Sequence, residues 1–369
     1  MTEDIKMKLG FGCMRLPMTE DQVDLPQFKK MVDEYIAAGG NYFDTAHGYI
    51  DGKSESALKP ALTERYPRSS YLLADKLSGN FFEKEEDIRP FFESQLHILG
   101  VDYLDFYLMH SQNAGNYEKY TRTHAYEIGA ELKKEGKIRY LGFSFHDKAE
   151  VLDRILTDHP EVDFVQIQFN YLDYEDPGVQ SRACYEVLRK HNKPMVVMEP
   201  VKGGRLARLS ENAGRFYREL GDLSPASYAI RFAAGMEGCA VVLSGMSNEE
   251  QMLDNLSYMK DFKPLSPAER EAVLKTTDVL RKEDTVDCTG CRYCVAGCPQ
   301  GILIPDLFTA VNEKQADFFS DKGKIAYEIV MADGSGKASD CVKCGACEEI
   351  CPQHLKIRRL LGKVRSYFE

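Results

Sequence analysis

The sequence predicts a closed (β/α)8 barrel followed by a small, mainly helical domain that is rich in cysteine. Three observations lead to this fold class. From residue 8 onward, short apolar runs alternate eight times with segments of helical period. No Gly-x-Gly-x-x-Gly follows the first run, which removes the main support for an open dinucleotide-binding sheet. Eight of the eleven cysteines fall in two tight groups near the C-terminus. The expected domains are residues 1–283 and 284–369.

Composition narrows the class of protein. With 43% hydrophobic and 28% charged residues, the 369-residue chain can bury a large core. Its net charge of −11 argues against a general nucleic-acid surface, which needs a basic face. No apolar run approaches the ~18 residues that span a bilayer, and the first residues lack the pattern of a signal peptide. Clustered cysteines indicate metal binding in a reducing compartment. We therefore expect a cytoplasmic protein without nucleic-acid or membrane partners, and the sequence leaves the oligomeric state open.

The alternation of strands and helices can be followed along the chain. The predicted strands are residues 9–14, 42–44, 71–76, 104–110, 138–144, 164–169, 195–198 and 240–244. The helices that follow them are predicted at 25–38, 54–66, 85–99, 117–135, 147–157, 178–190, 225–234 and 249–258. Two further amphipathic helices are expected at 210–220 and 266–282, and Ser266 with Glu269 has the spacing of a capping box. Eight units in sequence favour the barrel known as the TIM barrel.

Polar residues follow three consecutive predicted strands. Asp44 and Tyr49 follow the second strand, Lys76 ends the third, and His110 ends the fourth. The C-terminal ends of barrel strands all meet at one face, where barrel active sites are built. An acid, a phenol, an ammonium group and an imidazole are therefore expected together.

This combination of groups suits proton donation to a carbonyl. A phenol with a pKa near 10 is a weak acid at neutral pH, and a nearby ammonium group such as that of Lys76 would stabilise its phenolate. Asp44 would pair with Lys76 and hold it in place, while His110 could hydrogen-bond the substrate oxygen. Tyr49 would then protonate a carbonyl oxygen while a hydride arrives at the carbon.

From about residue 8 to residue 258, the chain resembles the aldo/keto reductase family. The matching residues are Asp44-Thr45-Ala46-x-x-Tyr49, Ser54-Glu55, Lys76, Leu99-Gly100-Val101-Asp102-Tyr103-Leu104-Asp105, His110, Gly136-Lys137-Ile138-Arg139-x-x-Gly142 and Gln166. The resemblance implies a small-molecule carbonyl substrate and a nicotinamide cofactor bound across the strand ends. It also implies a catalytic tetrad of Asp44, Tyr49, Lys76 and His110.

The resemblance extends to positions that hold the cofactor. Ser144 and Gln166 match residues that bind the nicotinamide carboxamide, and Met198 stands where an aromatic ring usually stacks. The pyrophosphate loop is implied at Pro200, Lys202, Gly203 and Gly204, and the adenosine site at Ser244, Gly245, Gln251 and Asn255. The adenosine segment lacks the arginine or lysine that usually grips a 2′-phosphate. NADP and NAD therefore both stay open as cofactors, and there is room for a flavin.

The cysteine groups share one pattern, Cys-x-x-Cys-x-x-Cys-x-x-x-Cys-Pro. They are Cys288, Cys291, Cys294 and Cys298, then Cys341, Cys344, Cys347 and Cys351. Three closely spaced thiolates can bind one [4Fe–4S] cubane, with the fourth thiolate supplied by the other motif. We therefore expect two clusters, the first with Cys351 as its fourth ligand and the second with Cys298. Zinc is the alternative, but structural zinc sites usually pair two Cys-x-x-Cys knuckles.

The 42 residues between the two motifs favour a helical class of dicluster ferredoxin over a compact β-type domain. They contain a predicted helix at 304–319 and a further apolar stretch at 325–331. The tail is therefore expected to be a mainly helical ferredoxin-like domain, with a redox partner protein as a candidate for docking there.

Three functions are consistent with these motifs. The first is an NAD(P)H-dependent carbonyl reductase whose clusters transfer electrons or sense redox state. The second is a ferredoxin- or flavin-linked oxidoreductase in which the clusters supply electrons to the barrel site, because nicotinamides move hydride whereas a cluster accepts one electron at a time. The third is a non-catalytic redox-sensing iron–sulfur protein, against which the four tetrad residues argue. No loop carries a pattern diagnostic of one substrate.

Overall fold

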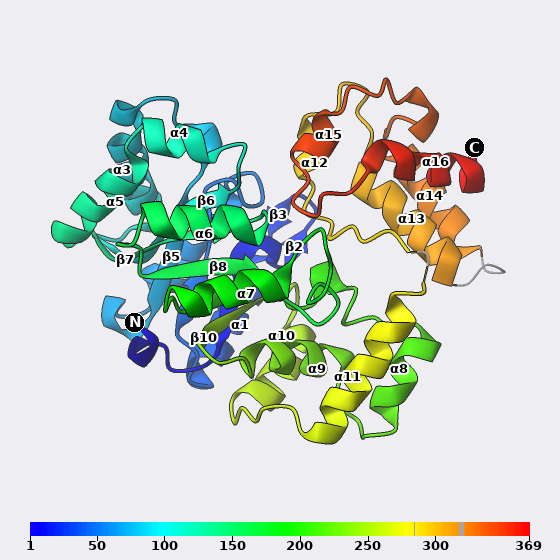
Figure 1. Ribbon diagram of the computed structural model, residues 1–369, viewed down its shortest axis with the longest axis horizontal. Helices are drawn as coiled ribbons and strands as arrows, with labels where there is room; N and C mark the ends of the chain where they lie inside the picture. Colours follow the sequence, from blue (N-terminus) through cyan, green and yellow to red (C-terminus); the bar gives the residue numbers. More distant parts are fainter. Residues whose placement is uncertain (284, 317–320) are drawn as a thin grey trace. The chain divides into compact units, whose positions relative to one another are not determined.

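The barrel contains eight parallel strands, as predicted. A computed structural model describes residues 1–283, 285–316 and 321–369. The strands are β1 (Leu9–Gly12), β4 (Tyr42–Asp44), β5 (Leu72–Leu77), β6 (Leu104–Gln112), β7 (Ile138–Phe145), β8 (Phe164–Gln168), β9 (Met195–Met198) and β10 (Cys239–Gly245). They close into a ring because β1 pairs in parallel with both β4 and β10. Figure 1 shows β8 of this barrel with the helix that follows it, α7, beside it.

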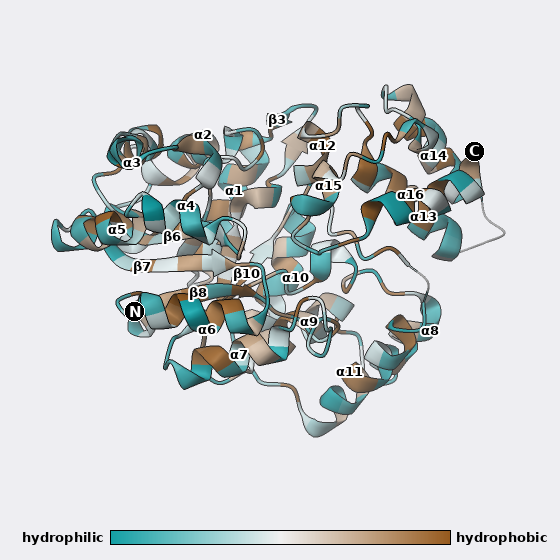
Figure 2. Cartoon of the chain, turned by 45° about the horizontal axis from the view of Figure 1, so that its top comes forward, coloured by the Kyte–Doolittle hydropathy of each residue, from teal (hydrophilic) through white to brown (hydrophobic). Residues whose placement is uncertain are grey.

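Helices follow the strands in the expected alternation. They are α1 (Leu25–Ala37), α2 (Lys53–Leu58), α3 (Glu85–Leu99), α4 (Tyr117–Arg122), α5 (Ala125–Lys134), α6 (Ala149–Asp158), α7 (Ser181–Lys190), α9 (Pro225–Ala234) and α10 (Glu249–Met259). Their apolar residues recur at helical spacing, which is why one side of each is buried. In α1, for example, Phe28, Met31, Val32 and Tyr35 are buried. Figure 2 shows α6 and α7 with hydrophobic and hydrophilic sides.

Large side chains fill the interior of the barrel. The cluster consists of Tyr42, Leu72, Ala74, Phe106, Leu108, Phe164, Val196, Val241 and Leu243. Alternate residues of a strand point to the same side, so these positions define which residues of each strand face inward. The interior is therefore a packed core. Inward-facing residues that follow this core, at the C-terminal ends of the strands, can form an active site.

Three predicted helices differ in the structure, and one hairpin was missed. An antiparallel hairpin, β2 (Met18–Thr19) with β3 (Gln22–Val23), was not predicted. The helix expected at 54–66 ends at Leu58 and continues as a π-helical turn. The helix expected at 117–135 divides at His124, and the one expected at 178–190 begins after Gln180. Both residues have positive φ, 52° and 57°, a conformation that surrounding packing must impose on a residue other than glycine.

The chain divides by its contacts into two compact units. The first comprises Met1–Asp176, Gln180–Pro200 and Ala226–Arg270, and the second comprises Pro177–Val179, Val201–Pro225 and Glu271–Glu369. Thus α8 (Glu211–Arg218), which fits the helix predicted at 210–220, joins the second unit. The predicted boundary after residue 283 stays a prediction, because this division follows contacts and not the ability of a part to fold alone.

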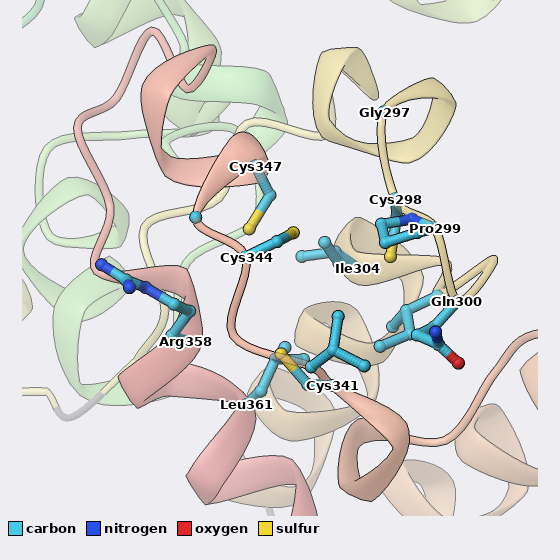
Figure 3. A pocket seen from close by; sticks show the side chains of 13 residues that line it. Gly297, Cys298, Pro299, Gln300, Ile304, Cys341, Cys344, Cys347, Arg358 and Leu361 are labelled. Atoms are coloured by element: carbon cyan, nitrogen blue, oxygen red, sulfur yellow. The ribbon is translucent and has the colours of Figure 1, made fainter.

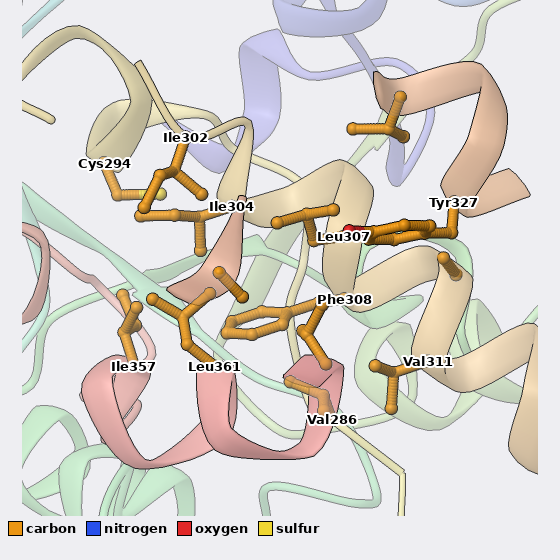
Figure 4. Close-up of a cluster of buried hydrophobic side chains, with 14 of the residues drawn as sticks. Val286, Cys294, Ile302, Ile304, Leu307, Phe308, Val311, Tyr327, Ile357 and Leu361 are labelled. Atoms are coloured by element: carbon orange, nitrogen blue, oxygen red, sulfur yellow. The ribbon is translucent and has the colours of Figure 1, made fainter. Parts of the chain in front are cut away.

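The second unit is mainly helical, as expected. Besides α8 it contains most of α11 (Pro267–Leu280), whose Ser266–Glu269 capping box forms as predicted, and α12 (Tyr293–Ala296), α13 (Ile304–Ala316), α14 (Lys322–Ala332), α15 (Ala346–Glu349) and α16 (Ile357–Phe368). The predicted end of the helix at 304–319 lies outside the described residues. Figure 4 shows the core of this unit, where Leu307, Phe308 and Val311 of α13 are packed with Leu361 of α16. Among the described residues, no helix has the length and apolarity needed to cross a membrane.

Candidate functional site

The side chains at the strand ends continue the inward-facing rows of the barrel. On β4, Asp44 follows the core residue Tyr42 by two positions, and on β5 Lys76 follows Ala74 in the same way. Strand register places Lys76 beside Leu108, so His110 lies one step further along the inward row of β6. The alternation of the strands therefore brings these three residues to one end of the barrel.

Lys76 is held by a buried ion pair. Its Nζ donates hydrogen bonds to Asp44 Oδ1 at 2.7 Å and to the Thr45 carbonyl at 2.6 Å. Neither Asp44 nor Lys76 is more than 4% exposed. Burial raises the pKa of Asp44 above its ordinary value, while Lys76 opposes that rise. The expected pairing of the two residues is therefore present.

Tyr49 lies beside this pair. Lys76 Nζ stands 4.8 Å from the centroid of its ring, and the His110 ring meets it edge-on at 6.0 Å between centroids. The pKa of Tyr49 is raised well above 10, first by burial and then by carboxylates that include Asp44. In this buried site the effect of burial outweighs the expected stabilisation of the phenolate by Lys76. Tyr49 therefore keeps its proton at neutral pH.

His110 is a neutral imidazole. Burial lowers its pKa well below 6.5, and the charges of Lys76 and His146 lower it further. Its Nδ1 lies 2.6 Å from Ser78 Oγ. When the Ser78 hydroxyl donates to Nδ1, the hydrogen of the ring sits on Nε2, from which it can be donated to a substrate oxygen. Ser78 was not predicted, although it follows Lys76 by two residues.

The residues expected to hold the nicotinamide lie on neighbouring strands of the first unit. Ser144 Oγ accepts a hydrogen bond from the Ser111 backbone N–H at 2.7 Å. Gln166 Nε2 contacts Met198 Sδ at 3.5 Å, and Gln166 Oε1 is buried with no hydrogen-bond partner among the described residues. A buried amide oxygen of this kind can accept from a ligand, as the carboxamide assignment requires.

Several residues expected around the adenosine form hydrogen bonds with other residues of the same segment. Asn255 Nδ2 donates to Ser244 Oγ at 2.8 Å, and Asn255 Oδ1 accepts from the Tyr258 hydroxyl. Gln251 Oε1 accepts from the Ser247 backbone N–H at 2.8 Å. Gly245 leaves room for the Arg15 side chain, whose Cβ and Cδ lie 3.3 Å from where a Cβ of residue 245 would stand. Pro200, which was assigned to the pyrophosphate loop, is buried and belongs to the first unit.

The predicted pyrophosphate residues Lys202, Gly203 and Gly204 lie in the second unit, where Gly203 faces the first cysteine motif and Lys202 faces the end of the second. A Cβ on Gly203 would come within 2.4 Å of the Thr289 carbonyl oxygen. Lys202 is 3% exposed, and its Nζ lies 3.4 Å from Gln353 Oε1. The sequence contained no signal of this packing, because the two segments are more than 80 residues apart.

A methyl group at residue 203 should disturb the first cysteine motif. Gly203 has φ +64° and its missing Cβ faces backbone atoms of Thr289, which cannot move aside cheaply. We expect Gly203→Ala to destabilise this unit by about 1–3 kcal/mol through overpacking and to lower the iron and sulfide content of the purified chain. Gly334→Ala is the control, since Gly334 also has positive φ but would meet nothing within 4 Å. Equal iron contents in the two variants would contradict the predicted packing effect.

Two cavities in the second unit are each lined by four cysteines. One is lined by Cys288, Cys291, Cys294 and Cys351, and the other by Cys298, Cys341, Cys344 and Cys347. These are the two ligand sets expected from the spacing, with one cysteine exchanged between the motifs. Figure 3 shows Cys298 approaching the second cavity from a different segment than Cys341, Cys344 and Cys347. Among the described residues, no three side chains of His, Cys, Asp or Glu are close enough to hold a single metal ion.

The residues around these cavities fit iron–sulfur clusters. Thiolates are the ligands that clusters take, and each cavity offers four cysteines with apolar neighbours such as Ile304. Burial raises the pKa of the Cys294 thiol to about 12 and that of Cys347 to about 11. A buried thiol loses its proton readily only when a nearby cation stabilises the thiolate. Iron would provide this stabilisation when it binds.

Comparison with protein families divides the chain at the same place as its motifs. Residues 8–276 match the aldo/keto reductase family, and residues 287–355 match a 4Fe-4S dicluster domain. Among curated proteins, the uncharacterized oxidoreductase YqkF of Bacillus subtilis is 25% identical over 287 residues, which are 69% of this chain and 88% of that protein. An NADH-specific methylglyoxal reductase of Escherichia coli is 30% identical over 194 residues, 47% of this chain and 58% of that protein.

Solved structures agree on the fold of the barrel. An aldo-keto reductase of Bacillus halodurans, in its holo form, is similar with a TM-score of 0.60 at 27% identity, over 73% of this chain and 91% of that one. An aldo/keto reductase of Klebsiella pneumoniae in complex with NADP and acetate gives 0.58 at 20% identity, over 74% and 90%. The second likeness concerns the fold alone.

Proposed function

The chain belongs to the aldo/keto reductase family, and we propose that it reduces an aldehyde or ketone with hydride from NADH or NADPH, with Tyr49 as the general acid. One observation carries this proposal. The phenol of Tyr49 keeps its proton in a buried site and has an ammonium group 4.8 Å from its ring centroid. A proton donor that becomes an anion beside a fixed cation is suited to protonating a developing alkoxide.

Each residue of the tetrad then has a defined task. The neutral His110 donates from Nε2 to the carbonyl oxygen and orients it toward Tyr49. Ser144, Gln166 and Met198 would hold the nicotinamide, which would provide the hydride for the carbonyl carbon. Tyr49 passes its hydroxyl proton to the oxygen, which completes the alcohol, and the phenolate left behind is stabilised by Lys76. Asp44 holds Lys76 in place through the bond of 2.7 Å. Tyr49 regains its proton from solvent before the next turnover.

The substrate class and the cofactor are the finer parts of the proposal. The relative in Escherichia coli is named for NADH and for methylglyoxal, a small carbonyl compound. Its 30% identity over 194 residues supports a small aldehyde or ketone as the substrate here and keeps NADH in consideration beside NADPH. Ser144, Gln166 and Met198 are the residues that we propose for the nicotinamide.

The dicluster domain supports a second candidate function. Two [4Fe–4S] clusters held by the eight cysteines would carry single electrons, exchanged with a redox partner protein. Gly203, which matches the cofactor loop, packs against Thr289 of the first motif. The two cavities lined by cysteines support an enzyme in which the clusters supply electrons to the barrel site through a flavin. A flavin is needed as an adaptor because hydride transfer moves two electrons together.

An anaerobic purification followed by cofactor analysis and turnover assays separates the two functions. We expect about eight iron and eight sulfide per chain, from two clusters, and no released flavin. Oxidation of NADH or NADPH should match, mole for mole, the loss of methylglyoxal used as the probe carbonyl. Bound flavin, or carbonyl reduction that requires a reduced ferredoxin in place of a nicotinamide, would establish the second function over the first.

A further inference from the structure

Two carboxyl groups lie in contact behind the catalytic lysine, outside the barrel interior. Asp75 precedes Lys76 on β5 and therefore points to the opposite side of the strand, and Glu55 comes from α2. Both residues are 0% exposed, and the Glu55 carboxyl faces that of Asp75 closely enough to raise its pKa. Two carboxylates buried side by side repel each other strongly, and a proton on one of them removes that repulsion.

The hydrogen-bond partners indicate which carboxyl carries the proton. Glu55 Oε1 accepts from Gln95 Nε2 at 3.1 Å, and Glu55 Oε2 faces His47 Nδ1 at 2.8 Å. Asp75 Oδ1 accepts from the Lys76 backbone N–H at 2.8 Å. Asp75 Oδ2 is buried and meets no donor among the described residues. A hydrogen on this atom, donated to Glu55, satisfies both groups.

The electrostatic surroundings agree with a protonated Asp75. Burial raises the pKa of Asp75 well above its ordinary range, and the neighbouring Glu55 raises it further, while Lys76 opposes the rise. The other titratable groups that face the pair are His47, from the loop after β4, and Tyr107, from β6. An ionised Asp75 would also raise the pKa of Tyr49, because both lie near the same strand ends.

The same network holds two segments of the active site. The Lys76 backbone donates to Asp75, and its carbonyl accepts from Gln95 Nε2 at 3.1 Å. Gln95 is fixed in turn by the Tyr107 hydroxyl, which donates to Gln95 Oε1 at 2.8 Å. His47 precedes Tyr49 by two residues and anchors that loop on Glu55. The positions of the lysine and the tyrosine therefore depend on one buried carboxyl pair.

We propose that Asp75 and Glu55 are positioning residues that share one proton, and that this shared proton keeps Lys76 and Tyr49 in place for catalysis. The role in catalysis rests on the function proposed for Tyr49. The protonated pair itself does not, and it can be detected without any substrate.

Infrared spectroscopy of the full chain tests for the shared proton. We expect the wild-type protein at neutral pH to show the carbonyl stretch of a protonated carboxylic acid, and Asp75→Asn to lose it. Asp105→Asn is the matched control. Asp105 is also buried and also accepts from the backbone of β5, at Leu73 N, but its two carboxyl oxygens accept from Arg68 and Arg139, so its replacement should leave the band in place. A wild-type spectrum without the band, or a band that persists in Asp75→Asn, would overturn the proposal.

The dependence of stability on pH gives a second measurement. A group whose pKa is raised in the folded state contributes stability at low pH, and that contribution is lost as the pH rises from the unfolded value of about 3.9 toward the folded value. Asparagine has the shape of protonated Asp75 and does not titrate. Asp75→Asn should therefore gain unfolding temperature over the wild type increasingly as the pH is raised above about 4. A constant difference between the two proteins would contradict the shared proton.

Turnover tests the positioning role. Asp75→Asn can accept from Lys76 N and donate to Glu55, so it should keep most of the wild-type kcat. Asp75→Leu can do neither, and we expect its kcat to fall about 10²-fold through misplacement of Lys76, with KM changed little. Equal kcat values for the Asn and Leu variants would refute the positioning role while leaving the infrared result standing. If neither these variants nor the wild type reduces carbonyls, the function proposed for Tyr49 fails, and the infrared and stability results still decide the shared proton.

Discussion

Replacement of Tyr49 by phenylalanine is expected to lower the kcat for carbonyl reduction by about 10²–10⁴-fold, the usual contribution of a general acid. The substitution removes one hydroxyl and leaves the ring that contacts Lys76 and His110. Without a proton donor, hydride transfer would leave the product as an unprotonated alkoxide in a buried site. The negative charge of the alkoxide costs much free energy where water is excluded. Affinity for NADH or NADPH, measured by fluorescence titration, should change little.

The control for this experiment is another tyrosine of the barrel. Tyr42 precedes Asp44 on the same inward row of β4, is fully buried, and its hydroxyl has no hydrogen-bond partner among the described residues. Removal of that hydroxyl breaks no bond, so Tyr42→Phe should keep the kcat of the wild type. Carbonyl reduction by Tyr49→Phe at the rate of Tyr42→Phe would overturn the assignment of the general acid.

Loss of any one cluster ligand is expected to remove one cluster, with iron falling from about eight to about four atoms per chain. The loss should also loosen the second unit, because Cys294 and Cys347 belong to its buried core and cluster binding is coupled to folding. Cys298→Ala and Cys351→Ala are the informative changes, since each of these residues is expected to ligate the cluster of the other motif. Iron, sulfide and electron paramagnetic resonance spectra measure the result.

Pairs of substitutions test the exchange of cysteines between the motifs. Cys288→Ala with Cys351→Ala affects one cavity and should leave about four iron atoms, whereas Cys288→Ala with Cys298→Ala affects both and should leave none. Cys184→Ala is the control, because this buried cysteine of α7 lies outside the motifs. If the first pair lost all iron and the second kept half, each motif would bind its own cluster and the exchange would be wrong.

The barrel could be predicted from the sequence because its signals are local. Each strand is a short apolar run, and each helix shows its own periodicity, so the order of elements followed without knowledge of any contact. The cysteine spacing is equally local, and it predicted both ligand sets that line the cavities. The division of the helix at His124 could not be predicted, since a positive φ in histidine is imposed by packing.

The chemistry of the site depended more on tertiary structure. The sequence predicted that Lys76 would stabilise the phenolate of Tyr49, but burial raises the pKa of Tyr49 well above 10. Burial is a property of the whole fold and cannot be inferred from spacing. The residues Lys202 and Gly203 were matched to a cofactor loop by resemblance, and only the structure revealed their contacts with Gln353 and Thr289.

By itself, the sequence determined the architecture of this protein, and it predicted the tetrad candidates and the two groups of candidate cluster ligands. These follow from periodicity and spacing, which the chain carries along its length. Only the tertiary structure decided the ionisation of Tyr49 and His110 and brought Asp75 against Glu55. Ionisation depends on which groups lose water together, and residues distant in sequence come to share one buried site only when the chain has folded.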